Sequence, residues 1–550
     1  MAHSTSLLPF ATFSKLLLRS YPALKFPVFA LLLWALSGCG ADHKCDTGAG
    51  PRCGAGTAGT SGASGTAGHS GSMAGQGDSG SSGEAEAGTA NAGVGGKDCE
   101  CGAAGESGAG GDSAKPRLDL KFANAFVIKA APRSDGSLLV LLDEPLDMRV
   151  DSGSPQRELL LLDAEGRPRK SLAASTSARF LLDFAVHPGD DVSVLYSSAS
   201  EYSLERFDTQ GDSVGELAIA DTEINEDPPT LPGAIVPVET LTRDAGRIAA
   251  FGEQVVVATR TGRHSVLTYR FSFFNDGAGA TYHREWRTLA VPPFGMSAIG
   301  LKGGSYDTFS AVQAQAMLHL AVDQLGTIYV AVQHPRTSEM ALIKAYAKAF
   351  GETLVGDADA QDLYVTRIDS SGTRVGTTVV GTAEDDQLFG LRAGEDSVLV
   401  MARKEYWNEQ GTGFDALVAQ LHGQSGALEL RELDVKRSDL AFDAAELADG
   451  TWLVTGASDW DQNPSGASVS EQSQAFLHTV TAGGETNGFA LANGPRHNEG
   501  RTLRSLGSGR WLIGGMTDGP GTHSGDADAS QVRASGFLRV YQLDGVGAKD

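Results

Sequence analysis

Residues 449–456 read Asp-Gly-Thr-Trp-Leu-Val-Thr-Gly, a glycine-containing turn followed by a short apolar run that favours β structure. Runs of this kind begin at seven positions: Leu138, Val192, Val255, Ile328, Val398, Trp452 and Trp511. A glycine lies two to four residues before each start, as expected where a tight turn joins two antiparallel strands. The intervals between starts are 54, 63, 73, 70, 54 and 59 residues, so the sequence predicts a sevenfold structural repeat.

A second strand pattern follows each of these anchor runs. Apolar and polar residues alternate in it, and an Asp followed by Gly often ends it, as in Asp362-Leu363-Tyr364-Val365-Thr366-Arg367-Ile368-Asp369-Ser370-Ser371-Gly372. The seven copies end at glycines: Gly166, Gly211, Gly277, Gly372, Gly426, Gly484 and Gly545. Alternation with period two indicates strands with two distinct faces, and Asp-x-x-Gly is typical of a turn.

A unit of 54 to 73 residues with about four short strands is the size of one propeller blade. We therefore expect an all-β fold in which residues 117–550 form one seven-bladed β-propeller of four-stranded blades. An array of β-sandwiches, or two separate domains, is the alternative.

The two ends of this region suggest how the ring closes. The last copy ends soon after Tyr541-Gln542-Leu543, too early for a fourth strand, while residues 118–122 (LDLKF) precede the first copy as an unassigned strand. We predict that residues 118–122 complete the last blade.

The segments at 362–372, 381–386 and 452–456 resemble the bacterial seven-bladed β-propeller repeat that is often found in secreted proteins. That repeat reads D-x-[FY]-V-x-K-[IL]-D-x-x-G, then a glycine and acidic segment, then G-N-[IV]-Y-V-T-G. The resemblance covers residues 360–517 and is degenerate before residue 330. It implies a fold much more than an activity.

The N-terminal residues have the features of a targeting signal. Residues 26–38 are a short apolar run preceded by Lys15, Arg19 and Lys25 and by no acidic residue, the profile of a signal peptide. The run is shorter than the about 20 residues that span a bilayer, which argues against a transmembrane anchor. Its end, Leu36-Ser37-Gly38-Cys39, resembles the lipobox of bacterial lipoproteins. The resemblance implies cleavage after Gly38 and a lipid on Cys39; an ordinary signal peptide is the alternative.

Residues 39–116 are dominated by Gly, Ala, Ser and Thr. Such a stretch cannot bury enough apolar surface to offset the entropy of ordering it, so we expect a disordered linker after the signal peptide of residues 1–38. With Cys39 lipidated, four cysteines remain, and we expect disulfides among them: Cys45, Cys53, Cys99 and Cys101. Three pairings are open. A metal site built from Cys99-Glu100-Cys101 and the earlier pair is the alternative.

The formal net charge is -24, and removal of the signal peptide would lose three basic residues and leave -27. An acidic surface of this kind repels phosphate backbones, so we expect no nucleic-acid partner. The expected attachments are a membrane, through the lipid, and a protein or glycan of unknown identity. We expect a monomer.

No linear motif of catalysis is present, and the histidines are scattered singly, for example His187, His319, His422 and His497. Asp459, Asp461 and Asn463 place oxygen ligands at alternate positions, which makes them weak calcium candidates. We expect no other metal and no cofactor. Glu384-Asp385-Asp386 coincides with the acidic turn of the repeat, which favours a structural role over acid-base chemistry.

These features favour a lipoprotein of the cell envelope, at the outer membrane or cell surface, that displays its propeller as a binding module. The long connections at 220–245, 276–312, 334–361 and 518–535 are the expected contact regions. The rival hypothesis is a propeller-fold enzyme, such as a glycan lyase or hydrolase, with a site at one channel mouth. A cluster of Arg, His and acidic side chains at the channel would favour the enzyme.

Overall fold

The computed structural model describes part of the chain, all of it within one compact unit, Ala92–Asp550. The described residues are 99–100, 115–143, 156–198, 201–219, 245–261, 265–275, 280–290, 318–333, 354–355, 363–382, 386–408, 411–434, 439–458, 473–484, 486–492, 497–519 and 535–543. Nearly all of the proposed linker and the whole signal region lie outside them. No helix among these residues has the length and apolar character needed to cross a membrane.

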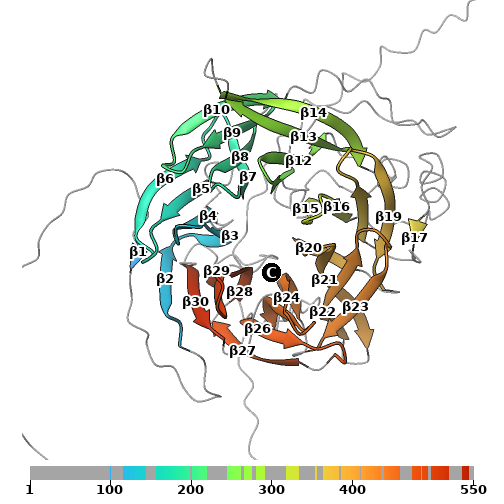
Figure 1. Cartoon of the computed structure of the whole chain (residues 1–550). Helices are drawn as coiled ribbons and strands as arrows, with labels where there is room; N and C mark the ends of the chain where they lie inside the picture. The colour runs from blue at the N-terminus through green and yellow to red at the C-terminus, as the bar shows by residue number, and fades with distance from the viewer. Residues whose placement is uncertain are drawn as a thin grey trace, which may run out of the picture. The chain divides into compact units, whose positions relative to one another are not determined.

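Seven antiparallel sheets of four strands each surround a common centre (Figure 1). The first blade consists of β3 (Phe126–Pro132), β4 (Leu138–Asp143), β5 (Arg157–Leu162) and β6 (Pro168–Ala174). The second consists of β7 (Phe180–Val186), β8 (Val192–Ser197), β9 (Tyr202–Phe207) and β10 (Ser213–Ile219). The third consists of β11 (Gly246–Phe251), β12 (Gln254–Thr261), β13 (Ser265–Asn275) and β14 (Ala280–Ala290).

The fourth blade consists of β15 (Leu318–Val322), β16 (Ile328–Gln333), β18 (Leu363–Ile368) and β19 (Arg374–Val380). The fifth consists of β20 (Asp386–Ala393), β21 (Ser397–Asn408), β22 (Gly411–His422) and β23 (Leu428–Leu433). The sixth consists of β24 (Leu440–Glu446), β25 (Trp452–Ser458), β26 (Gln474–Val480) and β27 (Thr486–Ala492). The seventh takes β28 (His497–Ser505), β29 (Arg510–Gly519) and β30 (Ser535–Gln542) from the C-terminus and β2 (Leu118–Ala123) from the N-terminus.

The seven anchor runs of the sequence are the second strands of the seven blades, and the runs that follow them are the third strands. The predicted seven-bladed propeller is therefore confirmed. Two sheets carry one additional two-residue strand that the sequence did not predict. These are β17 (Leu354–Val355), which pairs parallel to β19, and β1 (Cys99–Glu100), which pairs antiparallel to β2.

The predicted closing strand is also confirmed. β2 pairs antiparallel to β30, with Leu118 opposite Val540 and Ala123 opposite Ser535. Asp119 adds an ion pair across the junction, with its Oδ1 2.8 Å from Nε of Arg539. The last blade therefore contains strands from both ends of the described chain (Figure 1).

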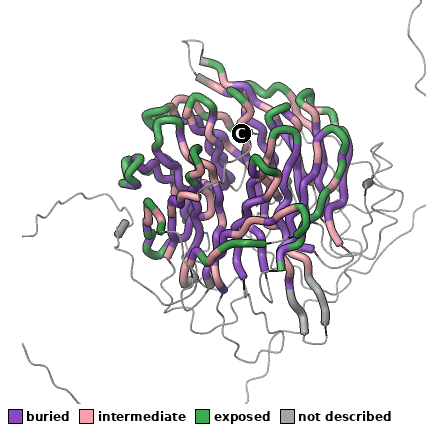
Figure 2. Tube along the Cα trace, turned by 60° about the horizontal axis from the view of Figure 1, so that its bottom comes forward, coloured by how far each residue is buried: buried purple, intermediate pink, exposed green. Residues whose placement is uncertain are grey.

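One apolar core fills each junction between neighbouring blades, and the series runs around the ring. The core between the fifth and sixth blades contains Met401 and Trp452, and the next contains Leu453 and Trp511. Five others join the remaining neighbours, including the seventh and first blades through Leu512 and Val140. Figure 2 shows the strands as mostly buried segments. The ring is thus held by packing between blades, without a single central core.

The two ends of the propeller differ in the length of their connections. Between the first and second strands of each blade the chain turns within a few residues, and in the first six blades the third and fourth strands are joined as briefly. The opposite strand ends are joined by all the long connections, such as residues 220–245, 291–317, 334–362, 459–473 and 520–534. We call these the turn end and the long-loop end.

Candidate functional site

Most of the site residues expected from the sequence lie outside the described residues. This holds for Cys39, Cys45, Cys53 and Cys101, for the calcium candidates Asp459, Asp461 and Asn463, and for most of the long connections. Cys99 lies in β1, where its register partner is Phe122. Within the described part of the chain, no group of three or more His, Cys, Asp or Glu side chains is arranged to hold a metal ion. The lipidation, disulfide and calcium predictions stay predictions.

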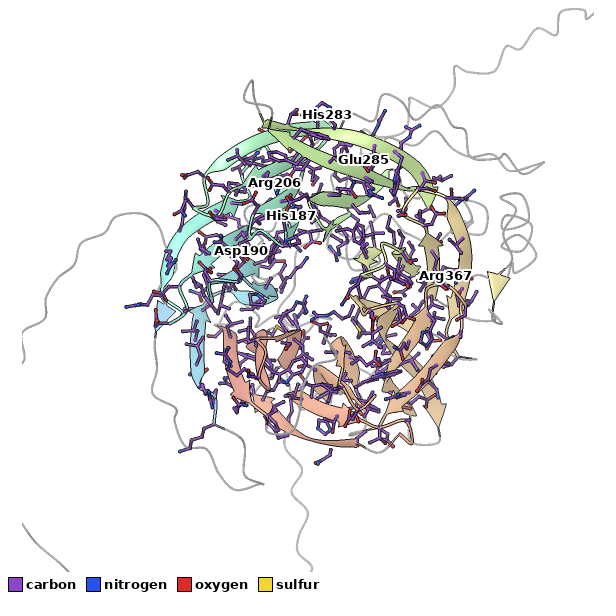
Figure 3. All side chains as sticks on the ribbon, in the orientation of Figure 1. His187, Asp190, Arg206, His283, Glu285 and Arg367 are labelled. Atoms are coloured by element: carbon purple, nitrogen blue, oxygen red, sulfur yellow. The ribbon has the colours of Figure 1, made fainter. Side chains whose placement is uncertain are left out.

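His187 has a buried hydrogen-bond network. Its Nε2 lies 2.7 Å from Ser193 Oγ, which lies 2.6 Å from the hydroxyl of Tyr282, and its Nδ1 lies 3.0 Å from the Gly252 carbonyl oxygen. A serine beside a histidine is the arrangement of an activated nucleophile. Ser193 is fully buried, however, so a substrate cannot reach it. The network joins the second and third blades off the propeller axis, where Figure 3 labels His187.

Asp386 has a structural role, as the sequence favoured. It is buried, and its Oδ2 accepts a hydrogen bond of 2.6 Å from the Thr382 backbone N–H. Glu384 and Asp385 lie outside the described residues.

Charged side chains from six blades gather at the centre of the ring, on the innermost strands. We call the following set the axial cluster: Lys129, Asp183, Arg247, Arg392, Asp443 and Arg504. Strand register shows how they arise. In each blade, one residue of the first strand pairs with the fourth residue of the anchor run on the second strand. We call its place the middle axial position. The seven residues at this position are Lys129, Asp183, Arg247, His319, Gly390, Asp443 and Thr502. Arg392 and Arg504 lie closer to the turn end, opposite the second residue of their anchor runs.

The cluster falls into two triads, each with one carboxylate between two cations. In the first triad, Lys129 Nζ donates to Asp183 Oδ1 at 2.7 Å and to the Phe184 carbonyl at 2.6 Å. Arg247 attracts Asp183 from the third blade. Although burial opposes its ionisation, the two cations hold the pKa of Asp183 below its usual value.

In the second triad, Arg504 Nη1 donates to Asp443 Oδ2 at 2.5 Å and to the Leu503 carbonyl at 2.6 Å. Arg392 Nη1 donates to the same carbonyl at 3.1 Å and lies 3.9 Å from Asp443 Oδ2. Arg392 belongs to the fifth blade and Leu503 to the seventh, so the arginine reaches past the sixth blade at the axis.

The two carboxylates also join neighbouring blades. Asp183 Oδ2 accepts the Ile248 backbone N–H at 3.2 Å, and Asp443 Oδ2 accepts the Leu503 backbone N–H at 2.8 Å. In the same way, Thr502 Oγ1 accepts the Ala130 backbone N–H at 3.3 Å. All three contacts run from a middle axial position to the equivalent backbone group of the next blade. Asp183 and Asp443 are therefore part of the framework and not free to act as bases.

The cations of the axial cluster outnumber its carboxylates by four to two. Burial lowers the pKa of Lys129, and Arg504 and Arg247 act in the same direction. Burial together with Arg504 lowers the pKa of Arg392 to about 10, so that Arg392 remains a cation at neutral pH. Like charges held together in a low-dielectric site cost free energy that an anion would recover. The cluster is thus a positively charged centre in an acidic protein.

A second arginine contact lies on the same inner strands, nearer the long-loop end. Arg501 stacks over the rings of Phe126 and Phe442, and its Nε lies 2.6 Å from Glu499 Oε2. Glu499 is fully buried and burial raises its pKa. Phe389 packs on Phe442 with ring centroids 4.9 Å apart.

Sequence reasoning missed the axial cluster because it aligned the second and third strands of each repeat and left the first strands unaligned. A signal was present. Five blades place alanine opposite the second residue of the anchor run, namely Ala131, Ala185, Ala249, Ala321 and Ala445. The fifth and seventh blades place Arg392 and Arg504 there.

No family model matches the chain, and no curated protein matches it in sequence. Similar solved structures include the β-propeller domain of the Trilobed protease from Pyrococcus furiosus, with 7% identity, 76% of this chain and 96% of that chain covered, and a TM-score of 0.38. The NanB sialidase from Streptococcus pneumoniae has 10% identity, 77% and 69% coverage and a TM-score of 0.34. Hsv2 from Kluyveromyces lactis has 10% identity, 76% and 98% coverage and a TM-score of 0.33. These likenesses are too remote to bear on activity or ligand.

Proposed function

We propose that the protein is a lipoprotein of the cell envelope, at the outer membrane or cell surface, whose propeller is a binding module for an anionic ligand held at the axis. The observation that carries the binding proposal is the excess of cations in the axial cluster, four against two carboxylates. The exterior of an acidic chain repels large polyanions, whereas the axis offers a local positive field to a small anion or an anionic group.

Partial exposure supports access to the site. The side chains of Lys129, Arg392 and Arg504 keep 27%, 24% and 21% of their surface open to solvent, while Asp183 and Asp443 keep only 8%. Of these five side chains, the three basic ones are therefore the more exposed. An incoming anion can meet them without first breaking the blade-to-blade contacts of the carboxylates.

One observation favours the rival enzyme hypothesis and another argues against it. Arginines and carboxylates do gather at the axis, which is the pattern that would favour an enzyme. Both carboxylates of the cluster, however, accept backbone N–H groups and ion-pair with cations, so neither is a free acid, base or nucleophile. Binding is the function that these contacts support best.

Binding is tested by titrating the purified chain with carboxylates, phosphates and matched neutral compounds, such as acetate against acetamide, by calorimetry and thermal shift. At constant ionic strength, anions should stabilise the protein and the neutral compounds should not, because a ligand that binds the folded state raises the melting temperature. An identical response to acetate and acetamide, or none to any anion, would refute the proposal. Turnover of a glycan or ester library would favour the enzyme instead.

The membrane address has its own test. Cells expressing the full chain are labelled with a radioactive fatty acid, and the Cys39→Ser variant serves as the matched control. We expect label and membrane association in the parent chain and neither in the variant, because Cys39 is the proposed lipid acceptor. Label that persists in Cys39→Ser would exclude this cysteine as the site.

A further inference from the structure

We infer that Arg392 and Arg504 form a paired clamp for one oxyanion group, a carboxylate or a phosphate. This inference rests on the proposed function and adds which residues bind and which chemistry they select. Five blades have alanine on the first strand opposite the second residue of the anchor run, which is the position of Arg392 and Arg504 in the other two blades. The framework therefore does not need a long side chain there. Two arginines at an alanine position call for a different explanation.

Both guanidinium groups have N–H donors left for a ligand. A guanidinium has five N–H donors, and the Nε–Nη2 edge forms the fork that matches a carboxylate or phosphate. Among the described residues, both arginines make their hydrogen bonds through Nη1 alone. Their remaining nitrogens are also not among the buried atoms that lack a partner. The Nε and Nη2 donors are therefore without a partner among the described residues and are not sealed from solvent.

The second triad carries an excess of positive charge. Among the residues that the structure describes, Asp443 is the single carboxylate between the two guanidinium groups, and it also accepts the Ala444 and Leu503 backbone N–H groups. One negative charge is thus shared by two cations that repel each other. An oxyanion bridging Arg392 and Arg504 would neutralise the second charge and supply the acceptors that Asp443 cannot.

The first triad gives a comparison within the same molecule. Lys129 is a point charge, and its ammonium already donates to Asp183 and to the Phe184 carbonyl. It contributes positive potential but no free fork. The selective contact is therefore assigned to the second triad, and Lys129 and Arg247 are assigned a supporting electrostatic role.

The test uses calorimetric titration of the full chain with inorganic phosphate and, separately, with acetate, so that the two sources of an oxyanion are compared. The affinity for so small a probe is expected on the order of 1 mM. Arg392→Ala and Arg504→Ala should each weaken binding about tenfold or more. Both variants restore the alanine that five blades already carry, so they should fold, and circular dichroism checks this.

Two further variants separate a clamp from simple attraction. Arg392→Lys keeps the charge but loses the fork, and it should also weaken binding. Arg169→Ala removes one cation from an exposed outer strand and should leave binding unchanged. If Arg392→Lys binds as tightly as the parent, or if Arg169→Ala weakens binding equally, the clamp is wrong.

The outcomes also separate this inference from the proposed function. Binding of phosphate or acetate that survives both alanine substitutions would overturn the clamp and leave an anion-binding protein with another site. Failure of the parent chain to bind any anion would overturn both.

Discussion

Four turns show how a single carboxylate and a single glycine close a hairpin. Asp163, Asp208, Asp323 and Asp369 each accept the backbone N–H groups two and four residues later through Oδ1. The glycine three residues after each one has a positive φ, for example +88° at Gly372. The Asp-x-x-Gly pattern in the sequence therefore encodes a complete local structure, which is why it predicted turns correctly.

Two glycines allow the free-energy cost of backbone strain at positive φ to be separated from the cost of a steric clash. Gly372→Ala and Gly450→Ala both place a side chain at positive φ, which costs about 1 kcal/mol. A Cβ at Gly450 meets nothing within 4 Å, whereas a Cβ at Gly372 would lie 2.8 Å from Cδ2 of Trp286. We expect Gly372→Ala to lose about 1 to 3 kcal/mol more than Gly450→Ala in urea denaturation. Equal losses would mean that Trp286 moves aside freely.

At the scale of elements, the closure of the ring depends on the strand β2. β2 places Leu120 and Phe122 in buried positions, and Leu120 packs with Leu512 and Leu538 of the seventh blade. The paired residues of β2 and β30 lie more than 400 positions apart in the chain. Closing so long a loop costs entropy that only the completed sheet and the core between the seventh and first blades can offset.

Deletion of residues 117–122 tests this closure. We expect the melting temperature to fall by about 10 °C or more, because two large side chains leave a core and the outer edge of β30 is exposed. Deletion of residues 80–85, six residues of the predicted linker, is the matched control and should change nothing. A melting temperature that survives the first deletion would show that the ring does not depend on β2.

At the scale of the whole molecule, an acidic chain encloses a cationic axis. The formal net charge is -24, and yet the six blades that contribute to the axial cluster bring four cations and two carboxylates together. The exterior charge favours solubility and repels polyanions, and the axis retains a local field of opposite sign. Stability and binding should therefore respond to salt in opposite directions.

Raising the ionic strength from about 10 mM to about 150 mM shortens the Debye length from about 30 Å to about 8 Å. Because repulsion among exterior carboxylates is screened, we expect the melting temperature to rise by about 2 °C, while the dissociation constant for phosphate increases. Scanning fluorimetry and calorimetry at the two salt concentrations measure both. The Arg392→Ala/Arg504→Ala double variant should keep the thermal gain, which separates screening from chloride bound at the axis. A falling melting temperature in the parent chain would contradict this account.

What the sequence determined by itself was the repeated framework. Strand alternation and tight turns are local patterns, and the first six blades are built from contacts within about 70 residues, so the blades could be predicted. The Asp-x-x-Gly turns followed for the same reason. The closure could be predicted because the last copy lacks a fourth strand and the run at residues 118–122 has no blade of its own. Asp386, which the sequence placed in an acidic turn, is buried and accepts the Thr382 backbone N–H.

Only the tertiary structure decided the axial cluster. Lys129 and Arg504 are separated by 375 positions, and no local pattern predicts that their charges interact. They meet because the ring closes and brings the first strand of every blade to one axis, where a residue that is alanine in five blades becomes arginine in two. The difference between those alanines and arginines can be read in the sequence. That the arginines lie together can be seen only in the folded ring, because only there do the first strands share one axis.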